Sequence, residues 1–123
     1  MRADLQALLE RVEKAEGPDE EVDMQLCLLA YPEIMAVSEK RDDGFWYHKQ
    51  WGRMSVPAKY TASIDAAVAL VEKVWVKDYW SIDAFNQATV GDGDRFQWRG
   101  NGRTPALALI AALLRALIAQ EKP

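Results

Sequence analysis

The fold of this chain is decided by one segment near its end, TPALALIAALLR (Thr104–Arg115). No charged or hydrogen-bonding side chain occurs from Pro105 to Leu114. Thr104 is a good helix N-cap, Pro105 suits the first helical position, and alanine and leucine are strong helix formers. A helix that is apolar on every side must be covered on more than one side. We therefore expect this helix to lie at the centre of the fold, with its alanines allowing a sheet or a second helix to approach closely.

Length, charge and cysteine content narrow the class of protein. The chain has 123 residues, of which 50% are hydrophobic and 28% charged, which predicts one folded domain spanning residues 1–123. The net charge of −4 divides into −5 over residues 1–23 and +1 over the rest, so no basic stripe for nucleic acid emerges. The uncharged run of ten residues is shorter than the roughly 20 of a membrane span. A lone Cys27 and the absence of an apolar signal sequence predict a cytoplasmic protein.

Three further segments have the apolar periodicity and end signals of helices. Acidic residues follow the N-cap of the second of them, where the helix dipole favours negative charge. The predicted helices run from a cap at Asp4 to about Glu16, from a cap at Asp19 to about Ala30, and over Ile64–Val74 with Thr61 or Ser63 as the cap.

Strand signals lie between these helices, separated by glycine-containing turns. Ile34–Val37 is a possible strand, and the aromatic segment Phe45–Trp51 is its return strand across the turn at residues 41–44. The segment 52–59 is predicted as a loop. Alternating residues over 76–85, then Ala88–Val90, a tight turn at Gly91–Asp94 and a returning strand at Arg95–Arg99 complete the pattern. The order α-α-β-β-α-β-β-β-α predicts an α+β fold: an antiparallel sheet of about four to five strands with helices on its faces, an α/β/α sandwich.

Three segments in this order and spacing resemble the phage ABA sandwich domain family, small proteins of phages and prophage regions. They are Gly17-Pro18-Asp19, Tyr60–Ala67, and Thr104–Leu109 continuing through Ala111–Ala116. The resemblance spans nearly the whole chain, but its motifs are helix caps and helix cores. It implies a sheet between helical layers and a protein of phage or prophage origin. The family has no assigned reaction, so no functional residue is carried over.

The sequence has few of the residue patterns that catalysis or metal binding requires. His48 is the only histidine, which excludes a histidine metal cluster, and a structural role is favoured over a general base. Asp92 and Asp94 flank Gly93 as in part of a calcium loop, but the later ligands are missing. Asp78 and Asp83 have opposite strand parity and should face opposite sides of a sheet. We expect no catalytic, cofactor-binding or metal site, and a protein that is not an enzyme.

The remaining indication of function is a group of tryptophan and arginine residues near the predicted hairpins. Tryptophan and arginine are enriched at protein interfaces, and both also serve single-stranded nucleic acids as stacking platforms. The candidate interaction surface comprises Trp46, Trp51, Trp98, Arg95, Arg99 and Arg103. The leading prediction is a non-enzymatic accessory domain that contacts an unidentified protein or forms a homodimer. The alternative is single-stranded nucleic-acid binding through the same surface.

Overall fold

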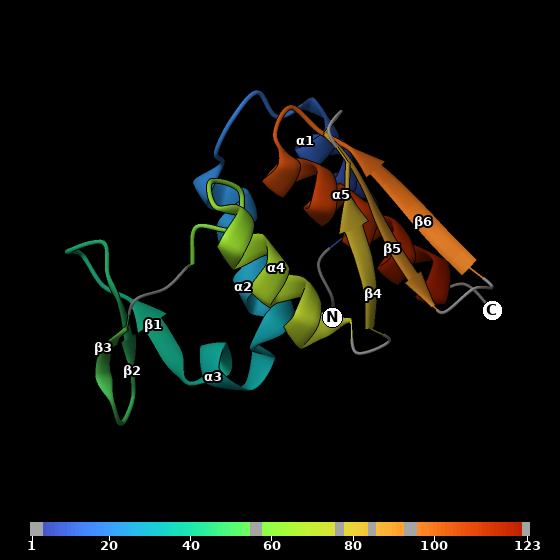
Figure 1. The fold of residues 1–123 in the computed structure, drawn as a ribbon. Coiled ribbons are helices and arrows are strands. Elements are labelled where there is room, and N and C mark those ends of the chain that lie inside the picture. Colours follow the sequence, from blue (N-terminus) through green and yellow to red (C-terminus); the bar gives the residue numbers. More distant parts are fainter. Residues whose placement is uncertain (1–3, 55–57, 76–77, 84–85, 93–95, 122–123) are drawn as a thin grey trace.

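A computed structural model describes residues 4–54, 58–75, 78–83, 86–92 and 96–121. The described chain has an α+β fold, which confirms the predicted class (Figure 1). Its helices are α1 (Leu5–Lys14), α2 (Glu20–Ala30), α3 (Pro32–Ala36), α4 (Ile64–Val74) and α5 (Pro105–Glu121). Its strands are β1 (Ser38–Lys40), β2 (Trp46–His48), β3 (Gly52–Met54), β4 (Asp78–Ile82), β5 (Gln87–Asp92) and β6 (Phe96–Asn101).

Helix α5 is the centre of the molecule, as its sequence predicts. Every residue from Ala106 to Leu114 is buried, and none exceeds 4% exposure. Strands β5 and β6 pack on one side of α5, and helices α1 and α4 pack on others. The Thr104 hydroxyl accepts a hydrogen bond from the Leu107 N–H at 3.2 Å, so the predicted cap is confirmed. Water is therefore excluded around the whole circumference of α5 from Ala106 to Leu114.

The backbone of β6 lies directly on the small residues of α5. A Cβ atom added to Gly100 would meet the Ala112 nitrogen and would lie 2.5 Å from the Ala108 carbonyl oxygen. One added to Gly102 would lie 2.7 Å from the Ala108 nitrogen. Alanine on the helix and glycine on the strand therefore together permit the close approach that the alanine-rich sequence predicts.

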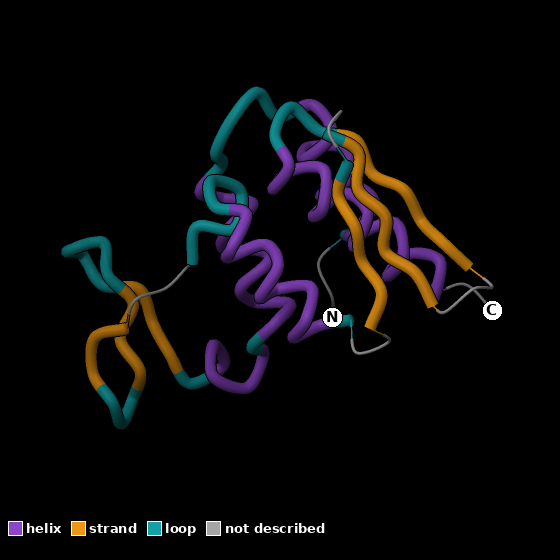
Figure 2. The backbone as a smooth tube through the Cα atoms, viewed as in Figure 1, coloured by secondary structure: helices purple, strands orange, loops and turns teal. Residues whose placement is uncertain are grey.

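The strands form two separate sheets, which corrects the prediction of one sheet with four to five strands. Strands β4, β5 and β6 form one antiparallel sheet in that order, and β1, β2 and β3 form the other. The second sheet is a meander of three-residue strands between positions 38 and 54. Each of its pairings joins neighbours in sequence, so none of its strands needs a partner from the larger sheet. Figure 2 shows the two sheets on opposite sides of the helices.

The larger sheet is covered on one face only, so the predicted α/β/α sandwich is wrong for the described part of the chain. Ala88 and Val90 of β5 face α5 and are buried. The alternate positions on the other face, which include Ser81, Gln97 and Arg99, are exposed. The layers are the sheet, then α5, then α1 and α4, with the all-apolar helix in the middle layer instead of the sheet (Figure 1).

The secondary structure of residues 31–54 was predicted less well than the helix caps. The predicted strand Ile34–Val37 lies mostly in helix α3, which starts with Pro32 at its first position. Part of the predicted loop 52–59 is strand β3. In contrast, Asp4, Asp19 and Ser63 each cap a helix through a side-chain oxygen, as predicted.

A buried polar cluster joins α2 to the turn that precedes α4. The carboxylate of Asp23, which is 4% exposed, accepts hydrogen bonds from both the Thr61 N–H and the Thr61 hydroxyl at 2.8 Å. The Asp19 N–H in turn donates to the Thr61 hydroxyl oxygen at 2.8 Å. Burial raises the pKa of Asp23 above its ordinary value of 3.8, although the two bonds from Thr61 act to lower it.

This arrangement predicts a pH-dependent effect of Asp23→Asn. The folded protein holds a proton on Asp23 at pH values where the unfolded chain has lost it. The free energy of unfolding that depends on this group therefore falls as pH rises from 3.8 through the raised pKa. Asparagine removes the titration and keeps an oxygen for Thr61. In urea unfolding between pH 4 and pH 7, the stability of Asp23→Asn relative to wild type should therefore rise with pH.

The matched control is Asp23→Ala, which also removes the titration but leaves the buried Thr61 N–H without its acceptor. It should lower the free energy of unfolding by about 1–3 kcal/mol at pH 7. A constant difference between Asp23→Asn and wild type over this pH range would contradict the raised pKa.

Candidate functional site

The structure does not gather the predicted surface residues in one place. Trp46 and Trp51 belong to the β1–β3 region, whereas Trp98 and Arg99 lie on β6 at the other side of the molecule (Figure 1). Arg103 lies in the short connection between β6 and α5. Arg95 lies outside the described residues, as do residues 93 and 94 of the predicted tight turn.

The aromatic residues of the β1–β3 region are paired with cationic or ring neighbours. Trp51 is 66% exposed and stacks on His48, with ring centroids 3.8 Å apart. The Arg53 guanidinium lies 4.6 Å from the ring centre of Phe45. Trp46, in contrast, is half-buried and packs against the core. Trp51 is therefore the member of the predicted set that offers the most accessible ring.

His48 has a structural role in this region. Its Nδ1 atom accepts hydrogen bonds from the Gln50 N–H at 3.0 Å and from the Trp51 N–H at 3.2 Å. The ring thereby holds the turn between β2 and β3.

The other reactive residue types do not converge on a site within the described residues. No group of three or more histidine, cysteine, aspartate or glutamate side chains in that part of the chain could hold a metal ion. Cys27 is buried beside Met35, with 3.8 Å between the two sulfur atoms. Burial raises the pKa of the Cys27 thiol, which disfavours the reactive thiolate.

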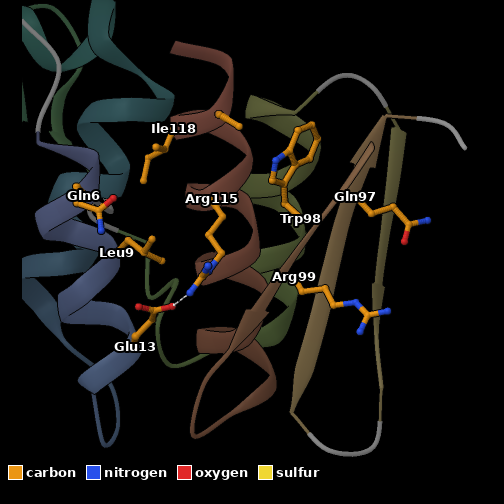
Figure 3. A pocket seen from close by; sticks show the side chains of 9 residues that line it. Gln6, Leu9, Glu13, Gln97, Trp98, Arg99, Arg115 and Ile118 are labelled. Carbon is orange, nitrogen blue, oxygen red and sulfur yellow. Dashed lines mark hydrogen bonds and ion pairs between the residues drawn. The ribbon is translucent and has the colours of Figure 1, made fainter. Parts of the chain in front are cut away.

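The structure shows a groove that the sequence analysis missed. It is an open cavity of about 780 Å³ between helix α1 and strand β6, with the second half of α5 as its floor. Figure 3 shows Leu9 and Glu13 on the α1 side, Ile118 and Arg115 on the floor, and Trp98 at the strand. Its volume lies within the range of about 300–1,000 Å³ that is usual for ligand sites.

The strand wall of this groove is the outer edge of the β4–β6 sheet. Strand β6 pairs with β5 on its other side. The Gly102 N–H donates to the Asn86 carbonyl at 3.4 Å, and hydrogen-bonded positions alternate along an antiparallel pair. The even-numbered residues of β6 therefore bond to β5. The N–H and C=O groups of Gln97, Arg99 and Asn101 point outward, where no strand of the described chain pairs with them.

Charged groups flank the groove differently on its two sides. Arg115 of α5 forms an ion pair with Glu13 of α1 across the floor (Figure 3). Arg99 is exposed and makes no ion pair or hydrogen bond with side chains of the described residues. In Figure 3, Gln97 and Arg99 point away from α5, whereas Trp98 points toward it. The alternation of polar and apolar residues in Gln97-Trp98-Arg99 indicates from sequence that the strand has one exposed and one buried face. It does not indicate that the strand lies at the edge of a sheet.

Comparison with protein-family models, with curated proteins and with solved structures gives no match. Within the described residues, none of the helices combines the length and apolarity needed to cross a bilayer. The groove and the exposed β1–β3 region are therefore the features of the described chain that bear on its function.

Proposed function

We propose that this protein is a non-enzymatic interaction domain that binds an extended segment of another protein along strand β6. The observation that carries the proposal is the open edge of β6 beside a groove whose floor combines apolar Ile118 and Ala119 with the ion-paired Arg115. An added strand would satisfy the outward N–H and C=O groups, and its alternate side chains would enter the groove. Strand addition of this kind obtains affinity from main-chain hydrogen bonds and specificity from side-chain pockets.

The chemistry of the edge favours a different protein over a second copy of this chain. In the two-fold antiparallel register that pairs residues 97–101 of two β6 strands, Arg99 lies directly opposite Arg99. Like charges at opposite positions of neighbouring strands are destabilising. Isolated cationic side chains on edge strands also protect against uncontrolled self-pairing. A homodimer in this register is therefore disfavoured, whereas a partner strand with an uncharged or acidic side chain opposite Arg99 avoids the repulsion.

We further propose a phage or prophage origin and a cytoplasmic location, and both rest on the sequence alone. The three segments that carry the family resemblance are helix caps and helix cores. The family name describes a sheet between helical layers, whereas one face of the described sheet is exposed. The proposed origin therefore rests on the resemblance of these segments and gains no support from the layer order.

The proposed binding mode predicts the effect of a proline in β6. The Gln97 N–H points away from β5, so Gln97→Pro removes a donor at the outer edge without removing a hydrogen bond of the sheet. Peptides selected from a random library on the wild-type protein should bind Gln97→Pro at least about tenfold more weakly, because main-chain pairing at the edge is blocked.

The control is Gln97→Ala, which changes the same side chain and keeps the N–H. It should bind the selected peptides with nearly wild-type affinity. Circular dichroism of both variants checks that the fold is retained, and amide chemical shifts of the wild type locate the bound peptide. Selected peptides that bind Gln97→Pro as well as Gln97→Ala, or that shift amides away from β6, would exclude strand addition.

A second candidate function, single-stranded nucleic-acid binding, is favoured by the exposure of Trp51. Its ring is stacked on His48 on one side, and Lys49 and Arg53 are neighbours in sequence that supply positive charge. An oligonucleotide should quench tryptophan fluorescence in the wild type but much less in Trp51→Ala, and added salt should weaken the effect. Unchanged fluorescence at low salt would remove this candidate.

A further inference from the structure

The geometry points to a specific side-chain pattern in the partner of the β6 groove: an acidic residue opposite Arg99, directly followed or preceded by a large apolar residue. This inference rests on the proposed binding mode and adds the chemical class of segment that the site selects. It follows from the register of β6, from the partners of Arg99 and from the composition of the groove floor.

The acidic position follows from the outward face of the sheet. A residue placed opposite Arg99 in an added strand would project to the same side of the sheet as Arg99, with Cβ atoms about 4.5–5.5 Å apart. That side is exposed, and its nearest cross-strand neighbour on β5 is the uncharged Thr89. The Arg99 guanidinium makes no ion pair with the described residues. A carboxylate is the group whose geometry and charge best match an exposed, unpaired guanidinium.

The apolar position follows from the alternation of side chains along a strand. The residue opposite Trp98 would project to the other side of the sheet, toward the groove floor. Trp98 and Ile118 are both partly buried hydrophobic residues packed against the core, and Leu9 of α1 is buried beside them. An apolar side chain at this position would remove the exposed parts of Trp98 and Ile118 from water, which stabilises the complex by about 25 cal/mol per Å² of apolar area.

The charges of the floor do not compete for the acidic side chain. Arg115, the other arginine of the groove, is already paired with Glu13. It also lies on the α5 side of the strand, whereas Arg99 points away from α5 (Figure 3). The two arginines therefore serve different faces of an added strand, and of these two only Arg99 has no ion-pair partner among the described residues.

The test uses short peptides of alternating threonine and valine with one central aspartate, flanked by glycine and serine for solubility. A matched peptide carries lysine in place of the aspartate. Each is titrated into the full-length, isotope-labelled protein, and the amide signals of Gln97, Arg99 and Asn101 report binding at the edge. We expect the aspartate peptide to bind at least about tenfold more tightly than the lysine peptide. With Arg99→Glu the preference should reverse, because the charge at the edge changes sign.

The outcomes separate this inference from the proposed function. If both peptides bind equally and Gln97→Pro weakens both, strand addition stands and the acidic specificity is overturned. If neither peptide shifts the β6 amides at millimolar concentration, both proposals are overturned. A concentration-dependent dimer that Gln97→Pro dissociates would show that a second copy occupies the edge, which also overturns the inference. A charge preference that reverses with Arg99→Glu supports it, because a general electrostatic attraction would not be confined to one position.

Discussion

Gly100→Ala is expected to lower the free energy of unfolding by about 3 kcal/mol or more, or to prevent folding. The added Cβ would lie 2.5 Å from the Ala108 carbonyl oxygen and 2.8 Å from the Ala111 carbonyl carbon. Both are main-chain atoms of a buried helix and cannot move aside as a flexible side chain can. Either β6 must lift from α5 or the helix must shift against α1 and α4. Urea unfolding followed by circular dichroism measures the loss.

The control for this prediction is Gly17→Ala in the connection between α1 and α2. A Cβ at Gly17 meets no atom within 4 Å, and its backbone is not among the glycines with positive φ. Alanine there should leave the free energy of unfolding within about 1 kcal/mol of wild type, with a small gain because the unfolded chain loses freedom. Equal stability of Gly100→Ala and wild type would show that the strand does not lie this close to the helix.

The second large effect concerns the all-round burial of α5. Leu107 and Leu109 point to nearly opposite sides of the helix, about 160° apart at 3.6 residues per turn. Both are 0% exposed. Each leucine-to-alanine substitution should therefore lower the free energy of unfolding by about 2–5 kcal/mol, because each leaves a cavity in a packed core. A surface helix would show such a loss on one side only.

Leu28→Ala on α2 is the matched control, since the same atoms are removed from a residue that is 39% exposed. It should cost less than about 1 kcal/mol, because little buried surface is lost. Thermal or urea unfolding of the three variants side by side makes the comparison. If Leu107→Ala or Leu109→Ala behaved like Leu28→Ala, one side of α5 would be accessible to water and the central position of the helix would be wrong.

The site was less predictable than the fold because its parts come from three distant segments. Trp98 and Arg99 were predicted from their residue types, and the structure places both at the groove. Leu9 and Ile118 were not predicted, because in the sequence they look like ordinary core residues of two helices. Trp51 was predicted to lie with Trp98, because aromatic content alone does not show which sheet a strand joins.

The sequence alone is enough to predict α1, α2, α4 and α5, their caps and the central place of α5, whereas it predicted a strand where α3 lies. These properties depend on hydrogen bonds within a few residues and on the count of apolar side chains around one helix, and both are local. Only the tertiary structure decided that the strands form two sheets, that α5 lies between the larger sheet and the other helices, and that β6 is an open edge beside a groove. Which strand lies at the edge of a sheet depends on how all the strands pair. Those pairings are set by contacts between residues far apart in the chain.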